Sequence, residues 1–164
     1  MNEIEELSPE DETRIARLRN RADCIQFAKN VEAKRPDLAR AALRHAVELQ
    51  VDGHVVTSPL LRDIWGAFYA YEEALFLKHG KRVRAGRTRK SLEGRGEIDA
   101  IEAIVLKPSP STGFAQMQAA GLLDKTFEAV VLRNPKHFSP AAVDAAKAKL
   151  QPWLDAAGSM APQP

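Results

Sequence analysis

The sequence predicts an all-α fold, a multi-helix domain of about seven or eight helices. Apolar residues recur at three- and four-residue intervals along nearly the whole chain, as on the buried face of a helix. Three of the four Ser-Pro pairs, at residues 8–9, 58–59 and 139–140, match the signal for a helix start, a capping Ser followed by Pro in the first turn. Alternating apolar and polar residues are scarce, and residues 51–56 form the only weak strand candidate.

Ser8-Pro9 begins the first predicted helix, which continues along an apolar stripe to a break at residues 34–37. A second helix follows to about Gln50, and the two are expected to form an antiparallel hairpin. Ser58-Pro59 begins the longest helix, which ends near His79. This helix is apolar on two sides, which predicts a central position in the fold.

The rest of the chain predicts shorter helices. One covers about Arg87 to Glu93, and a second covers Glu97 to Leu106 after a turn at residues 94–96. Beyond a Pro-containing connector, three more are expected: from a Thr112 cap to Gly121, from Leu122 to about Arg133, and from Ser139-Pro140 onward, with Pro152 a point at which the last helix can end or kink.

The expected organisation is one core with a smaller C-terminal unit. Residues 1–12 form an acidic N-terminal segment, and residues 13–107 form the main helical core with a basic Gly/Arg-rich loop. Residues 108–157 form a C-terminal three-helix unit, and residues 158–164 form a flexible tail.

Composition excludes several classes of protein. The 164 residues are 45% apolar and 28% charged, which is typical of a globular domain rather than a disordered chain. One cysteine, Cys24, excludes an internal disulfide framework and a Cys-rich zinc site. No apolar run has the roughly 18 residues of a membrane helix, and the N-terminus is acidic where a signal peptide is basic. The expected location is cytoplasmic.

The net charge of +2 conceals an uneven distribution. Residues 1–12 carry −6, residues 13–95 carry +9, and residues 96–164 carry −1. A basic middle of this kind favours a polyanionic partner, although solvated helix faces also account for it. The acidic segment is a candidate competitor that folds back on the basic residues.

The basic residues concentrate between Lys78 and Arg95, where eight positive charges face one acid, Glu93. Arg guanidinium groups bind phosphate oxygens in pairs, and hydroxyl groups add donors. The candidate nucleic-acid-binding residues are Lys81, Arg82, Arg84, Arg87, Thr88, Arg89, Lys90 and Arg95. Five further cations extend this surface if the first hairpin packs beside it: Arg14, Arg17, Arg21, Arg40 and Arg44.

Two segments partly match a known phosphate-binding motif. Residues 84–106 have the length of a helix-turn-helix, but Glu97, Asp99 and Glu102 make its second helix acidic, which suits a DNA groove poorly. Residues 80–88 superficially resemble a nucleotide phosphate loop. The spacing of the glycines is wrong, Arg87 stands where the motif has Lys, and no strand precedes the segment, so nucleotide hydrolysis is excluded.

Catalytic patterns are sparse. The four histidines, at positions 45, 54, 79 and 137, lack metal-ligand spacing, and Cys24 has no histidine placed beside it by local spacing. Glu72 and Glu73 are candidates for a general base, but adjacent helix positions point about 100° apart. One of them is expected to pair with an Arg. We therefore expect no catalysis, no cofactor and no metal.

The sequence thus favours non-catalytic binding of nucleic acid. DNA is favoured over RNA because the aromatic residues fall on apolar helix faces and leave few rings for stacking on single strands. The alternative is a helical protein–protein adaptor or regulatory subunit that presents Phe114, Phe127 and Phe138. A third interpretation is an accessory domain of a nucleic-acid enzyme.

Overall fold

The chain is all-helical, as predicted. The computed structural model describes residues 6–108 and 113–159, and these form nine α-helices and two 3-10 helices, with no strand. The α-helices are α1 (Pro9–Ala16), α2 (Arg21–Val31), α3 (Pro36–Asp52), α4 (Pro59–His79), α5 (Gly86–Arg95), α6 (Glu97–Val105), α7 (Phe114–Ala119), α8 (Phe127–Arg133) and α9 (Pro140–Ser159). The 3-10 helices are η1 (Leu123–Lys125) and η2 (Pro135–His137).

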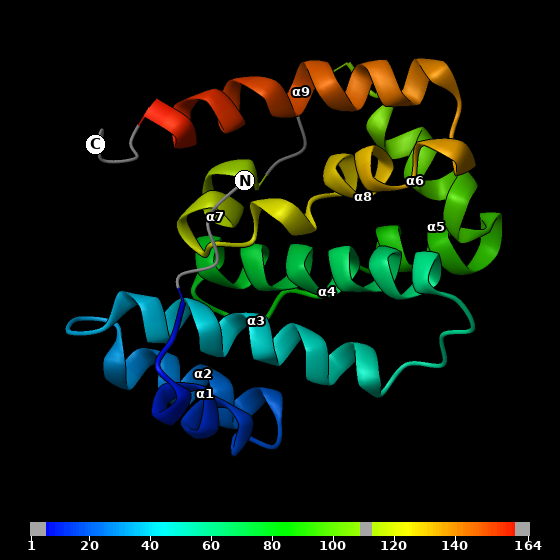
Figure 1. The fold of residues 1–164 in the computed structure, drawn as a ribbon. Coiled ribbons are helices and arrows are strands. Elements are labelled where there is room, and N and C mark those ends of the chain that lie inside the picture. Colours follow the sequence, from blue (N-terminus) through cyan, green and yellow to red (C-terminus); the bar gives the residue numbers. More distant parts are fainter. Residues whose placement is uncertain (1–5, 109–112, 160–164) are drawn as a thin grey trace.

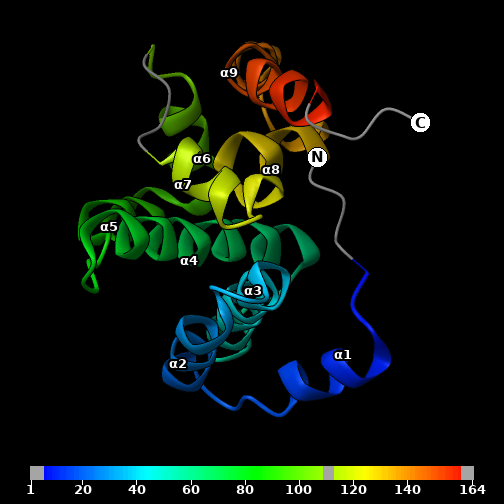
Figure 2. The ribbon, with the colours of Figure 1, turned by 90° about the vertical axis from the view of Figure 1, so that its left-hand side faces the viewer.

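Helix α4 runs through the middle of the molecule. Helices α1, α2 and α3 lie on one side of it, and α6, α7, α8 and α9 lie on the other, with α9 outermost (Figures 1 and 2). Ile64 and Phe68 of α4 join a core with α5, α6, α8 and α9. Ala70 and Ala74 join a second core with α1, α2, α3 and α7. The two apolar sides of this helix therefore correspond to two cores.

The ends of α4 follow the local rules. The Ser58 hydroxyl accepts a hydrogen bond from the Leu61 N–H at 3.2 Å, with Pro59 in the first turn. Gly80 ends the helix with φ of +69°, a left-handed conformation that glycine adopts without a steric penalty. The chain can therefore reverse sharply at this point, which places residues 81–95, the basic segment, against α4.

The first predicted helix is wrong in one respect, because it is two helices. α1 ends at Ala16, and α2 begins after Asn20, whose side-chain oxygen accepts from the Asp23 N–H at 2.8 Å. The Asn20 amide donates in return to the Asp23 carboxylate at 2.9 Å. This reciprocal cap is visible in the sequence, but the apolar stripe continues across it and hides the break.

Two other boundaries differ from expectation. The helix predicted from Leu122 begins as the 3-10 turn η1, and α8 starts only after Thr126, whose hydroxyl accepts from the Ala129 N–H at 3.2 Å. Pro152 lies inside α9, which continues to Ser159. The predicted Thr112 cap and residues 160–164 of the predicted tail lie outside the described residues.

The C-terminal helices share the core of the central helix. Val130 and Val131 of α8, and Ala142 of α9, pack in the same cluster as Ile64 and Phe68. No helix of the described chain is both long and apolar enough to cross a membrane.

Candidate functional site

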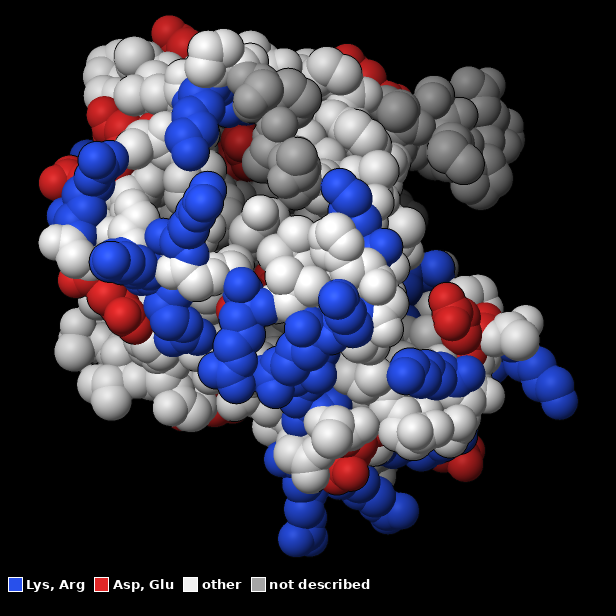
Figure 3. Space-filling view, turned by 180° about the vertical axis from the view of Figure 1, so that it is seen from behind, with Lys and Arg blue, Asp and Glu red and all other residues white. Residues whose placement is uncertain are grey.

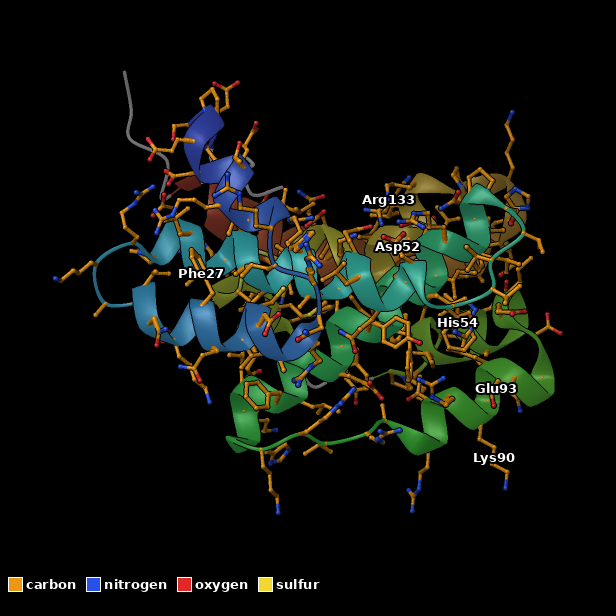
Figure 4. The ribbon with its side chains drawn as sticks, turned by 90° about the horizontal axis from the view of Figure 1, so that it is seen from below. Phe27, Asp52, His54, Lys90, Glu93 and Arg133 are labelled. Carbon is orange, nitrogen blue, oxygen red and sulfur yellow. The ribbon has the colours of Figure 1, made fainter. Side chains whose placement is uncertain are left out.

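The basic segment retraces the path of α4. After Gly80, the connector of residues 81–85 runs back along α4, and the buried Glu72 carboxylate accepts a hydrogen bond from the Ala85 N–H at 3.1 Å. Helix α5 then continues towards the first half of α4, as the view from below shows (Figure 4). The segment is therefore a short connector followed by a helix, and the helix predicted at about Arg87 to Glu93 is α5, which extends from Gly86 to Arg95.

Arg89 anchors α5 to α4. Its guanidinium carbon lies 4.8 Å from the ring centroid of Phe68, 5.6 Å from that of Trp65 and 5.7 Å from that of Tyr69. The next turn of the helix buries Leu92 completely. The inward face of α5 thus combines an aliphatic contact with cation–π contacts, which are worth about 0.5–2 kcal/mol each in general.

The outward face of the basic segment carries six exposed cations. They are Lys81, Arg82 and Arg84 in the connector and Arg87, Lys90 and Arg95 in α5. We call these six side chains the basic surface. Figure 3 shows Lys and Arg side chains gathered on this face, and Figure 4 shows Lys90 pointing away from the protein. Within the part of the chain that the structure describes, none of the six makes an ion pair.

The other two predicted site residues lie differently. Thr88 is half-buried. Arg89 is half-buried against the α4 rings and lies 3.7 Å from the Glu93 carboxylate one turn later. Arg89 therefore positions the basic surface rather than belonging to its exposed part. The sequence places Arg89 among eight similar cations, and only the contact with α4 distinguishes it.

His54 adds no positive charge near this anchor. Its ring stacks on Trp65 with 3.9 Å between centroids, and its Nδ1 lies 3.3 Å from the Tyr69 hydroxyl. Burial, and then the charge of Arg89, hold the pKa of His54 below its usual value. A neutral imidazole therefore completes the aromatic cluster at neutral pH.

The cations predicted to extend the site from the first hairpin are largely occupied by acids. Arg14 lies 3.2 Å from the Asp11 carboxylate, and Arg44 lies 2.7 Å from that of Asp124. Arg21 is paired with the buried Glu73. Arg17 is exposed and makes no ion pair with any described residue. Helix α2 lies against the end of α4, where Arg21 and Lys29 contact the Phe76 ring.

The acidic segment engages a different part of the molecule over its described residues. Asp11 accepts from Arg35 at 2.8 Å as well as from Arg14, and the Arg35 hydrogen bond is the main reason that the pKa of Asp11 is lowered. This pairing joins α1 to the start of α3. Glu3 and Glu5 lie outside the described residues.

Helices α5 and α6 follow one another across a turn, as in a helix-turn-helix, but α6 is not placed to contact DNA bases. α5 and α6 meet at Gly96, which has φ of +95°. α6 then buries Ala100, Ile101 and Val105, and the Glu102 carboxylate accepts from the Ser139 N–H at 3.1 Å. Because α6 packs in the protein core and bonds to the start of α9, it is not free to enter a DNA groove.

The candidate catalytic groups are engaged in the fold. Glu72 holds the connector, and Glu73 accepts from Arg21 and from Gln50. Burial, with the charge of Asp23 next, raises the pKa of the Cys24 thiol to about 11, so the thiol is protonated at neutral pH. Among the described residues, no group of three or more His, Cys, Asp or Glu side chains is placed to hold a metal ion.

A polar cleft of about 400 Å³ lies between α3, α4 and α8. Its charged side chains already neutralise one another: Arg62 and Lys125 both pair with Glu48, at 3.1 and 2.9 Å, and Arg133 pairs with Asp63 at 2.6 Å. The side chains of this cleft therefore form an ion-pair network that links the helices, whereas the basic surface has unneutralised charge.

Compared with known proteins, the chain matches no family model, no curated protein and no solved structure.

Proposed function

We propose that the protein binds duplex nucleic acid, DNA rather than RNA, without catalysis and through phosphate contacts. The observation that carries this proposal is the basic surface: six exposed cations on the outward side of one segment, with no ion pair to any described residue. A cation without an internal partner releases the counterions of a polyanion when it binds, which is the main source of sequence-independent affinity for DNA.

The anchoring of the segment supports the same proposal. Glu72 fixes the end of the connector, and Arg89 and Leu92 fix one side of α5. The six exposed side chains therefore project from a fixed backbone instead of a loose loop, which lowers the entropy that binding removes. The first turn of α5 has no side-chain cap, and the Gly86 N–H donates to the Arg84 carbonyl at 2.9 Å. The N–H groups of Arg87 and Thr88 in that turn remain as further donors.

The aromatic residues favour a duplex over a single strand. Binding of single strands depends on exposed rings on which bases stack. All ten aromatic residues of the chain lie in the described part, and each is buried or half-buried. A phosphate-bearing duplex needs no such platform.

The adaptor interpretation requires Phe114, Phe127 and Phe138 at the surface. The exposed fractions of these residues are 3%, 5% and 8%, so they contribute to the cores instead of a docking face.

The direct test is a titration of a fluorescently labelled 20-base-pair DNA duplex at 0.15 M salt with wild-type protein and with the triple variant Arg84→Ala, Arg87→Ala, Lys90→Ala. Each phosphate contact contributes about fivefold to affinity at this salt concentration, so we expect the triple variant to bind about 100-fold more weakly. The matched control is Lys107→Ala, Lys136→Ala, Lys147→Ala. It removes the same charge from exposed positions outside the basic segment and is expected to bind like wild type.

The same titration includes single-stranded DNA, duplex RNA and vesicles containing phosphatidylserine. Tighter binding to the DNA duplex than to the other three supports the proposal. Preference for any of the other three contradicts it, as does equal loss of affinity in the test and control triple variants.

A further inference from the structure

Helix α2 lies beside the end of α4, where the basic segment begins. The ring of Phe76 is contacted from two positions on α2: the Arg21 guanidinium carbon is 5.1 Å from its centroid, and the Lys29 ammonium is 5.8 Å from it. Phe76 is only two residues before Lys78 and five before Lys81. The α2 surface is therefore next to the basic surface in space, although some 50 residues separate the two in sequence.

This side of the hairpin has exposed cations of its own. They are Arg17 and Arg19, in the turn between α1 and α2, and Lys29 on α2. We call these three residues the α2 arm; they are exposed and make no ion pair with any residue that the structure describes. Two acids are also exposed here, Asp23 on α2 and Glu32 directly after it, and Asp23 is held by the Asn20 cap. Seen from behind, Lys and Arg side chains extend from α5 across the connector to α2 in a nearly continuous band (Figure 3).

Two contacts on α4 give the length of this band. Arg89 contacts Phe68 and Lys29 contacts Phe76, which are eight residues apart on one helix; at 1.5 Å per residue the two points are about 12 Å apart. Arg95 lies six residues farther along α5 and adds up to about 9 Å. Duplex DNA carries one charge per roughly 1.7 Å of its axis, so a length of about 20 Å presents about 12 phosphates.

We propose that the α2 arm and the basic surface bind one duplex at the same time, so that the site extends over two segments held together by α4. This inference rests on the proposed function and adds Arg17, Arg19 and Lys29 to the phosphate-contacting residues. A stiff, extended polyanion fits a band of this length better than a small anion does, because only a long ligand reaches both ends.

The test variant is Arg17→Ala, Arg19→Ala, Lys29→Ala. We expect it to bind the 20-base-pair DNA duplex about 100-fold more weakly at 0.15 M salt and to lower the magnitude of the slope of log K against log[salt] by about 3. The salt slope separates a phosphate contact from a structural role, because a side chain that only supports the fold does not change the number of counterions released. Lys29→Arg, which keeps the charge, is expected to bind like wild type.

The control on α2 is Gln26→Ala, an exposed neutral position whose side-chain amide donates to Asn30 at 2.9 Å, and this variant is expected to bind like wild type. If the α2-arm variant binds like wild type while the Arg84, Arg87, Lys90 triple variant loses affinity, the extension to α2 is overturned and the proposed function stands. If neither variant loses affinity, both are overturned. An unchanged slope in the α2-arm variant also overturns the extension.

Discussion

Arg21→Ala is expected to lower the free energy of unfolding by about 3–5 kcal/mol, the usual cost of leaving one partner of a buried ion pair alone. The Glu73 carboxylate has an exposed fraction of 1%. It accepts from Arg21 through both oxygens, at 2.5 and 3.0 Å, and from Gln50 at 3.2 Å. Without the guanidinium, a buried carboxylate retains one neutral donor, which compensates little of its lost hydration.

Urea denaturation at pH 7, followed by circular dichroism, measures this change as a lower midpoint at constant slope. Arg14→Ala is the matched control, because Arg14 pairs with Asp11 at 3.2 Å while its own side chain is 47% exposed. Exposed pairs contribute about 0–1 kcal/mol. Equal effects of the two variants would contradict the assignment of the Arg21–Glu73 pair as a buried cross-link.

The same pair connects stability to the proposed site. Arg21 ties α2 to α4, and Lys29 depends on that packing for its place beside the basic surface. Arg21→Ala is therefore expected to weaken DNA binding through loss of the α2 arm, even under conditions where most of the protein remains folded.

Glu128→Met is expected to stabilise the protein by about 1–3 kcal/mol at pH 8, the usual cost of an unsatisfied buried polar group. Glu128 is completely buried on α8, and neither carboxylate oxygen has a hydrogen-bond partner. The nearest cation, Lys149, lies 3.9 Å away and donates instead to the Val105 carbonyl at 2.6 Å. An apolar side chain of similar volume removes these two unsatisfied hydrogen-bond acceptors from the core.

Glu128→Gln tests the ionisation through the pH dependence. Burial raises the pKa of Glu128 above its ordinary value of 4.5, so the folded state holds this proton at pH values where the unfolded chain has lost it. Stability due to this group therefore falls as pH rises above about 4.5 and then stays low above the raised pKa. The advantage of Glu128→Gln over wild type should grow over that range and vanish below about pH 4.

Glu102→Gln is the control of opposite sign. Hydrogen bonds from Ser139 lower the pKa of Glu102, so its contribution is present at neutral pH and is lost as pH falls below its ordinary range. Guanidinium chloride denaturation at pH values from 3 to 8 measures the stability of all three proteins. A wild type that is more stable than Glu128→Gln at pH 8 would contradict the account of Glu128.

The sequence predicted what local rules decide. Caps at Ser8 and Ser58, and the glycine at position 80, lie where the structure starts or ends helices, because such signals act within one turn. The central place of α4 followed from its two apolar sides. The break at Asn20 was missed because a continuous apolar stripe outweighed a cap.

The site was predictable only as a segment. Charge counting selects residues 81–95, but it cannot separate Arg89, which packs on Phe68, from Arg87, which is exposed. Contacts between distant residues make that distinction, and they also bring Lys29 to Phe76. The burial of Glu128 is likewise set by α9 packing over α8, which no local pattern of charge or hydropathy encodes.

The most direct measurement is the slope of log K against log[salt] for a 20-base-pair DNA duplex between 0.05 and 0.3 M salt. Each phosphate contact contributes about 0.9 to this slope, so the basic surface alone predicts about −5 and the basic surface with the α2 arm about −8. The Arg84, Arg87, Lys90 triple variant should be less steep than wild type by about 3. A slope near zero in wild type, or equal slopes in the two proteins, would contradict the claim that this surface binds a polyanion.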